Sequence, residues 1–144
     1  MKTMHAIDTP LDADRVFGFL ADVRNEIHWR ESVVGSRYVG ASAPAVGVEG
    51  ETDVAMGPKS LTMKWAIIDY SDGRTVAWRL DGDPWAGGGR YTVTAVPGGS
   101  RVEAQLEVRL SGAARVFGPL MGVQLRGGLR SDLRRLGEML PQMA

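Results

Sequence analysis

The chain has 144 residues, a length that suits one domain able to bury roughly two-thirds of its unfolded surface. Hydrophobic residues make up 44% and charged residues 24%, values typical of a globular protein rather than a disordered one. The 17 basic and 17 acidic side chains cancel, so no net field draws the chain toward nucleic acid. We therefore expect a single domain over residues 1–144 with no nucleic-acid partner.

The absence of cysteine excludes disulfides, thiolate catalysis and cysteine-based metal sites. The first residues, MKTMHAID, lack the apolar core of a signal peptide. No apolar run approaches the roughly 20 residues that span a bilayer. We expect a cytoplasmic protein without stable membrane insertion.

The N-terminal segment predicts a short strand over residues 5–8, ended by Pro10, and then two short helices. Asp12 is placed to cap a helix that begins at Ala13. The second helical stretch is expected at about residues 22–29. One apolar face of the first helix is formed by Val16, Phe17 and Leu20.

From Val33 to Leu110 the hydrophobic period changes to two, which predicts strands with one buried and one wet face. The alternation is clearest over residues 101–110. Residues that favour tight turns separate the strands, as at Ser71-Asp72-Gly73 and Pro97-Gly98-Gly99. Each strand is therefore followed by its antiparallel neighbour, and the pattern predicts a meander.

After Ser111-Gly112 the period returns to 3.6 and predicts a long C-terminal helix that begins or is kinked near Pro119. This helix and the one-sided sheet must bury their apolar faces against each other. The predicted fold class is α+β, with a curved antiparallel sheet of about seven strands wrapped around the helix. The expected apolar arc consists of Phe117, Met121, Gln124, Leu125, Gly128, Leu129, Leu136 and Leu140.

Large side chains occupy the inward positions of the strands and of the helix, beside small ones such as Gly89 and Ala104. Aromatic residues with small neighbours suit the wall of a cavity, and Gln124 on the buried helix face would need a partner such as water or a ligand. The same side chains could instead form a filled core, and the pattern leaves both interpretations open. The candidate ligand-binding residues are Trp65, Trp78, Trp85, Tyr91, Met63, Phe117, Met121 and Gln124.

The order of elements resembles the helix-grip fold of the START-like superfamily. Its polyketide cyclase/dehydrase and lipid-transport branch opens with a block similar to AIDTPLDADRVFGFLADVRNEIHW, and GGGRYTVTAVPGGSRVEAQLEV resembles two later strands of that branch. The matching positions of the first block are Ile7, Pro10, Val16-Phe17, Asp22 and Trp29. The resemblance implies a cavity between sheet and helix that accepts lipids, polyketides or other hydrophobic molecules.

Other site chemistry finds little support in the residues. A zinc site needs about three ligands, and the two histidines, His5 and His28, lie on different elements. No G-x-S-x-G motif is present for a serine nucleophile. The run Gly87–Gly89 lacks the following Lys-Ser/Thr and the helix of a phosphate-binding loop. We expect no metal and no cofactor.

Cyclase chemistry is the enzymatic alternative, because an aldol closure needs a proton donor or acceptor that faces the cavity. Tyr91 has inward parity, and His28 is expected near the pocket mouth, whereas Arg79 and Arg90 have outward parity. Related cyclases line the cavity with several Arg and Tyr side chains, and the pattern here assigns only Tyr91. We expect ligand binding rather than catalysis, with a cyclase or dehydratase acting on a polyketide-like substrate as the alternative.

A stripe of arginines, Arg126, Arg130 and Arg134, runs along the helix opposite its apolar arc, and Arg115 and Arg135 extend it. Only Asp132 and Glu138 are near enough in sequence to offset this charge. The stripe is either a solvated helix face or a surface that docks an acidic protein or a lipid head group. A protein-interaction module that uses this basic face is the second alternative.

Overall fold

The computed structural model describes residues 2–56, 58–81 and 85–143, without the side chains at 56, 81, 85, 113, 114 and 117–125. Its strands form one antiparallel sheet in the order β1-β7-β6-β5-β4-β3-β2. The elements are β1 (Lys2–Thr9), α1 (Ala13–Ala21), η1 (Val23–Asn25), α2 (Glu26–Trp29), β2 (Val33–Val39), β3 (Glu49–Met56), β4 (Lys59–Ser71), β5 (Thr75–Asp81), β6 (Trp85–Val96), β7 (Gly99–Leu110), η2 (Gly112–Phe117), α3 (Gly118–Met139) and η3 (Leu140–Met143). The predicted helix-grip fold is confirmed.

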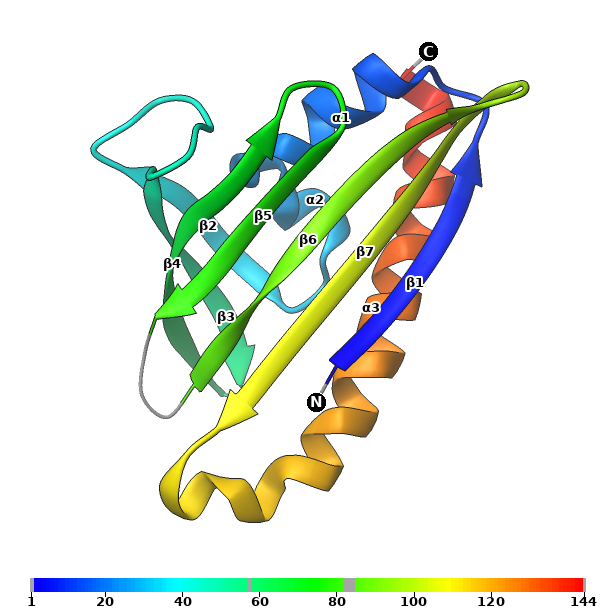
Figure 1. The fold of residues 1–144 in the computed structure, drawn as a ribbon. Helices are drawn as coiled ribbons and strands as arrows, with labels where there is room; N and C mark the ends of the chain where they lie inside the picture. Colours follow the sequence, from blue (N-terminus) through cyan, green and yellow to red (C-terminus); the bar gives the residue numbers. More distant parts are fainter. Residues whose placement is uncertain (1, 57, 82–84, 144) are drawn as a thin grey trace.

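The sheet curves, and all three α-helices lie on its concave side (Figure 1). β2 to β7 follow one another as a meander, while β1 pairs with β7, the last strand in the chain. Helix α3 packs along β1. A hydrogen bond from the Arg15 guanidinium to the Met143 carbonyl joins α1 to the end of the chain. The short helices and the C-terminal helix therefore cover one face of the sheet together.

The N-terminal helices begin as the sequence predicts. Asp12 accepts a hydrogen bond from the backbone N–H of Arg15 (3.0 Å) and caps α1. Asp22 caps the next turn through the N–H of Arg24 (3.1 Å). The predicted second helix is divided into the 3₁₀ turn η1 and the short helix α2, whose last residue, Trp29, is fully buried.

The core lies between the inner face of the sheet and the helices. Along β7, Val102, Ala104, Leu106 and Val108 are buried, which confirms the predicted alternation. The prediction was wrong for Gly128, which is exposed. Successive helical residues are about 100° apart, and Gly128 lies just outside the buried arc. Helix α3 contributes Leu129, Leu133, Leu136 and Leu140 to the core.

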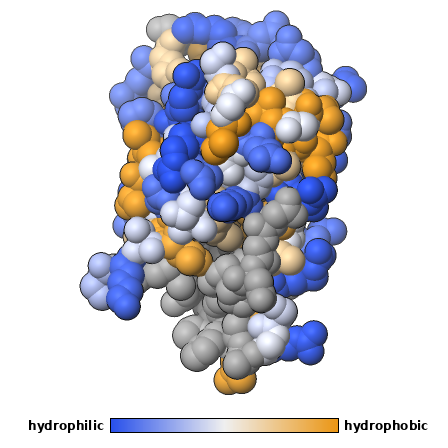
Figure 2. Space-filling model, turned by 90° about the vertical axis from the view of Figure 1, so that its left-hand side faces the viewer, coloured by the Kyte–Doolittle hydropathy of each residue, from blue (hydrophilic) through white to orange (hydrophobic). Residues whose placement is uncertain are grey.

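The exposed apolar residues are dispersed. Figure 2 shows the side of the molecule on which β2, β3 and β4 lie, where hydrophobic residues form separate groups among hydrophilic ones. Val34, Val39 and Val46 are exposed in this part of the chain. Single exposed valines are ordinary on a folded surface. None of the described helices is long and apolar enough to cross a membrane.

Candidate functional site

A cavity of about 190 Å³ lies between the concave face of the sheet and the N-terminal helices. The end of α1, the segment from η1 to β2, and strands β3 to β7 supply its walls. Most of the side chains that face it are apolar, because the inward positions of these strands carry aliphatic and aromatic residues. The strand residues of this kind are Val54, Leu61, Met63, Trp65, Ile67, Val76, Trp78, Leu80, Leu106 and Val108.

Trp65 forms one wall and has its polar atom satisfied within the sheet. Its indole Nε1 donates to Thr52 Oγ1 (2.9 Å), and its ring contacts Tyr38 edge-on, with 6.2 Å between ring centroids. The ring lies over Gly50, where a Cβ would come within 2.2 Å of it. A glycine opposite the tryptophan is therefore a packing requirement.

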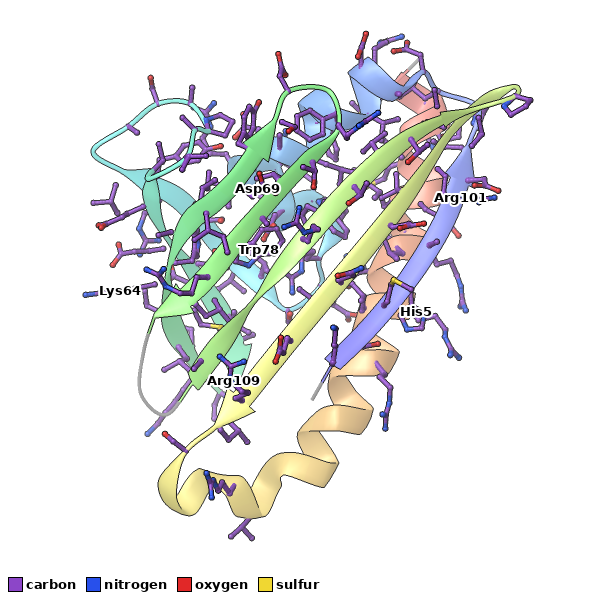
Figure 3. The ribbon with its side chains drawn as sticks, in the orientation of Figure 1. His5, Lys64, Asp69, Trp78, Arg101 and Arg109 are labelled. Carbon is purple, nitrogen blue, oxygen red and sulfur yellow. The ribbon has the colours of Figure 1, made fainter. Side chains whose placement is uncertain are left out.

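Trp78 forms the neighbouring wall, near the middle of the sheet (Figure 3). Its ring lies over Gly89, where a Cβ would approach it to 2.5 Å. It also contacts Tyr91 edge-on, at 4.7 Å between ring centroids. Gly89, one of the small residues that the sequence pattern associated with a cavity, thus makes room for the Trp78 ring.

One wall of the cavity is polar and charged. The Tyr91 hydroxyl on β6 donates to Glu26 Oε1 of α2 (3.0 Å). Glu26 Oε2 accepts a hydrogen bond from Arg30 Nη1 (3.3 Å). Arg30 Nε lies 3.7 Å from Asp132 Oδ2 of α3, and Asp132 Oδ1 accepts the backbone N–H of Glu31 (3.1 Å). We call Glu26, Arg30, Tyr91 and Asp132 the polar cluster; it joins α2, β6 and α3.

Burial controls the ionisation of the polar cluster. It raises the pKa of Tyr91 well above its usual value of 10, and the nearby Glu26 carboxylate raises it further, so the phenol stays neutral. Burial also raises the pKa of Asp132 above its usual 3.8, although the Glu31 N–H and Arg30 oppose this. Burial would lower the pKa of Arg30, but the carboxylates of Glu26 and Asp132 oppose this and the pKa is raised, so Arg30 is a permanent cation.

The structure brings half of the predicted binding residues to the cavity. Met63, Trp65, Trp78 and Tyr91 all line it. The side chains of the other four, Trp85, Phe117, Met121 and Gln124, lie outside the described residues. From Arg126 onward, no described residue of α3 lines the cavity.

The structure does not bring His28 to the cavity. Its side chain is exposed on α2 and is not among the described lining residues. Glu26 and Arg30 are four residues apart and share one face of this turn, whereas His28 lies two residues from each and points to the other side. The predicted position of His28 at the pocket mouth therefore has no support in the geometry.

Three members of the polar cluster were missed by the sequence analysis. Asp132 was considered only as a nearby charge that could offset the arginine stripe, whereas the structure buries it and pairs it with Arg30. Of the Arg and Tyr side chains, only Tyr91 was assigned to the cavity from the sequence, and the structure adds Arg30 and Tyr38. The available signals were an acidic residue at a core position of the helix and the i, i+4 pair of Glu26 and Arg30.

The remaining predicted features lie away from the cavity, apart from Gly88, which is one of its lining residues. The arginines of the stripe, Arg126, Arg130 and Arg134, are exposed as predicted. Arg90 faces outward and pairs with Asp69 across the outer surface of the sheet (2.8 Å). The glycine run 87–89 is paired in register with both neighbouring strands. The described part of the chain contains no group of three His, Asp or Glu side chains that could hold a metal ion.

Comparison with known proteins places the chain among proteins of this architecture. The sequence profile of the family described as "Polyketide cyclase / dehydrase and lipid transport" matches residues 2–140. No curated protein sequence matches the chain. A crystal structure of a protein from Thermus thermophilus is similar, with a TM-score of 0.83 and 13% identity over 100% of this chain and 99% of the other.

Two further solved structures carry informative names. A START superfamily protein from Mycobacterium smegmatis has a TM-score of 0.72 and 15% identity, over 99% of each chain. The di-domain ARO/CYC protein BexL from the BE-7585A biosynthetic pathway has a TM-score of 0.75 and 13% identity, over 97% of this chain and 50% of BexL. At such low identities these similarities support the START-like fold and carry no residue roles.

The raised pKa of Asp132 predicts a pH-dependent difference between the wild type and Asp132→Asn. Between pH 3.8 and the folded-state pKa, the native state binds the Asp132 proton more tightly than the unfolded state does. Tighter proton binding by Asp132 in the native state stabilises the fold at low pH. This stabilisation is lost as the pH rises through that window, and the free energy of unfolding falls by about 1.4 kcal/mol for each unit by which the pKa is raised. Asparagine does not bind this proton, so the wild type should lose stability relative to Asp132→Asn as the pH rises through the window.

Urea denaturation at a series of pH values measures this difference. Glu138→Gln is the control, because it removes a carboxylate at an exposed position of the same helix. A wild type that gains stability relative to Asp132→Asn as the pH rises would contradict the assignment.

Proposed function

The chain belongs to the polyketide cyclase/dehydrase and lipid-transport family, and on that premise we propose that it binds a hydrophobic small molecule, such as a lipid or a polyketide, in the cavity described above. The observation that carries the proposal is the composition of the walls. Apolar side chains line most of the cavity, and the charged groups among the described lining residues are confined to Glu26 and Arg30 on one side. A mostly apolar pocket with a few convergent polar groups is the usual form of a small-molecule site.

The size of the cavity limits the ligand. Apolar cavities of about 150 Å³ bind benzene, so about 190 Å³ suits a single ring or a short acyl chain. Burying ~300 Å² of apolar ligand contributes ~7 kcal/mol at ~25 cal/mol/Å². Association costs at least ~4 kcal/mol, which leaves ~3 kcal/mol from apolar contact alone. A tighter ligand must gain the rest from the polar cluster.

Filling the cavity should abolish binding. Met63 and Lys64 are neighbours on β4, but Met63 lines the cavity and Lys64 is exposed on the opposite face, where it points away from the sheet (Figure 3). We expect Met63→Trp to weaken binding of n-butylbenzene at least tenfold, because the indole occupies the ligand's volume. Lys64→Trp, the matched control, should bind as the wild type does.

Saturation-transfer NMR with n-butylbenzene measures binding to each protein. A wild type that shows no transfer, or equal loss in both variants, would remove the basis of the proposal.

A second candidate function, an aromatase/cyclase-type reaction, is favoured by the hydrogen bond between Tyr91 and Glu26 at the cavity wall. Ring closure by an aldol step requires an enolate to form and an alkoxide to be protonated. The neutral Tyr91 hydroxyl is a proton donor, and the Glu26 carboxylate is an acceptor. BexL, a structural neighbour, is named as an ARO/CYC protein.

This candidate predicts that the protein changes the cyclisation products of a linear poly-β-ketone thioester, and that Tyr91→Phe slows the reaction ~100-fold or more. His28→Ala is the control, because His28 is exposed and outside the described lining. Product analysis by liquid chromatography and mass spectrometry decides the matter. Identical products with and without protein exclude the reaction, and full turnover by Tyr91→Phe excludes the role of Tyr91.

A further inference from the structure

We propose that the polar cluster recognises an uncharged oxygen on the ligand, a carbonyl or a hydroxyl, and selects it over a carboxylate. This inference rests on the proposed binding function and names the chemical class of the ligand's polar end. It follows from the hydrogen-bond donors that Arg30 retains and from the charge balance around them.

Arg30 has N–H groups that no described residue accepts. A guanidinium carries five N–H groups, and among the described residues only Glu26 accepts a hydrogen bond from it. Its Nε is buried without a hydrogen-bond partner, 3.7 Å from the nearest oxygen of Asp132. Arg30 lines the cavity, and buried donors without acceptors are costly. A ligand oxygen at this wall would satisfy N–H groups that the described part of the protein leaves unpaired.

The other polar groups of the lining are largely engaged within the protein. The Tyr38 hydroxyl donates to the Ala21 carbonyl (3.2 Å) and accepts the N–H of Val23 (3.3 Å). Thr52 Oγ1 accepts from the Trp65 indole. The Tyr91 hydroxyl donates its hydrogen bond to Glu26. Apart from the Ser32 hydroxyl, the donors of the described lining that are left for a ligand therefore belong to Arg30.

The charge balance of the polar cluster disfavours an anion. Two carboxylates, Glu26 and Asp132, flank the single guanidinium of Arg30, and Tyr91 is neutral. With both carboxylates ionised, the formal charge is about −1 before any ligand binds. A ligand carboxylate would add a second uncompensated negative charge in a buried site, which is unfavourable. A ketone or an alcohol accepts the same hydrogen bonds without adding charge.

The test uses three ligands with the same chain length and different polar ends: 2-octanone, 1-octanol and octanoate. Because Trp65 and Trp78 line the cavity, quenching of tryptophan fluorescence at pH 7.5 reports on occupancy. We expect 2-octanone and 1-octanol to bind at least tenfold more tightly than octanoate. Equal or tighter binding of octanoate would overturn the inference.

A charge variant separates the effect of the polar cluster from the hydration of the free anion. Glu26→Gln removes one negative charge and keeps one oxygen that can accept from Arg30, while its amide NH2 can donate to the Tyr91 hydroxyl oxygen. It should raise the affinity for octanoate at least fivefold relative to 2-octanone. An unchanged ratio of the two affinities would show that the charge of the cluster does not select the ligand.

The wild type provides a measurement that does not depend on any variant folding. The carbonyl ¹³C resonance of bound, labelled 2-octanone should lie downfield of its position in an apolar solvent such as hexane, because the carbonyl accepts from Arg30. Binding without such a shift would overturn the inference and leave the proposed function intact. Failure of both n-butylbenzene and all three ligands to bind would instead count against the proposed function itself.

Discussion

The Arg30 guanidinium lies between the carboxylates of Glu26 and Asp132, and this buried ion-pair arrangement connects elements that are far apart in the sequence. A buried charge is tolerated only when it is paired and hydrogen-bonded. The pairing holds α2 against α3, and the hydrogen bond from Tyr91 to Glu26 ties α2 to β6. These contacts place the short N-terminal helices over the concave face of the sheet. They also leave one wall of an otherwise apolar cavity polar.

The cavity results from the same geometry. Trp65 and Trp78 stand on the inner face of the sheet over glycines that could not carry a Cβ, so the rings lie close to the strands rather than filling the space above them. Their contacts with Tyr38 and Tyr91 are edge-on, an arrangement that aromatic pairs favour. The result is an apolar cavity with one charged wall, which suits a molecule with one apolar and one polar end.

The sheet and its inner face could be predicted because a strand has a period of two, and parity alone identified Trp65, Trp78 and Tyr91 as neighbours. Parity could not decide whether they form a core or a cavity wall, since that depends on how the helices lie over them. The polar cluster could not be predicted in the same way. Arg30 and Asp132 meet across about a hundred residues, and from the sequence Asp132 was considered only as a charge near the arginine stripe. Asp132 lies in the sequence between Leu129 and Leu133, which are both buried, and this position was the signal that Asp132 is buried too.

The most direct measurement of the central claim is xenon binding in crystals of the protein. Xenon occupies empty apolar cavities and avoids charged, hydrated ones. We expect one strong anomalous peak within the sheet–helix space, bounded by Trp65, Ile67 and Trp78, which line the apolar part of the cavity. No xenon in that space, with these side chains packed directly against the helices, would mean that the residues form a filled core, and the account of a binding cavity would be wrong.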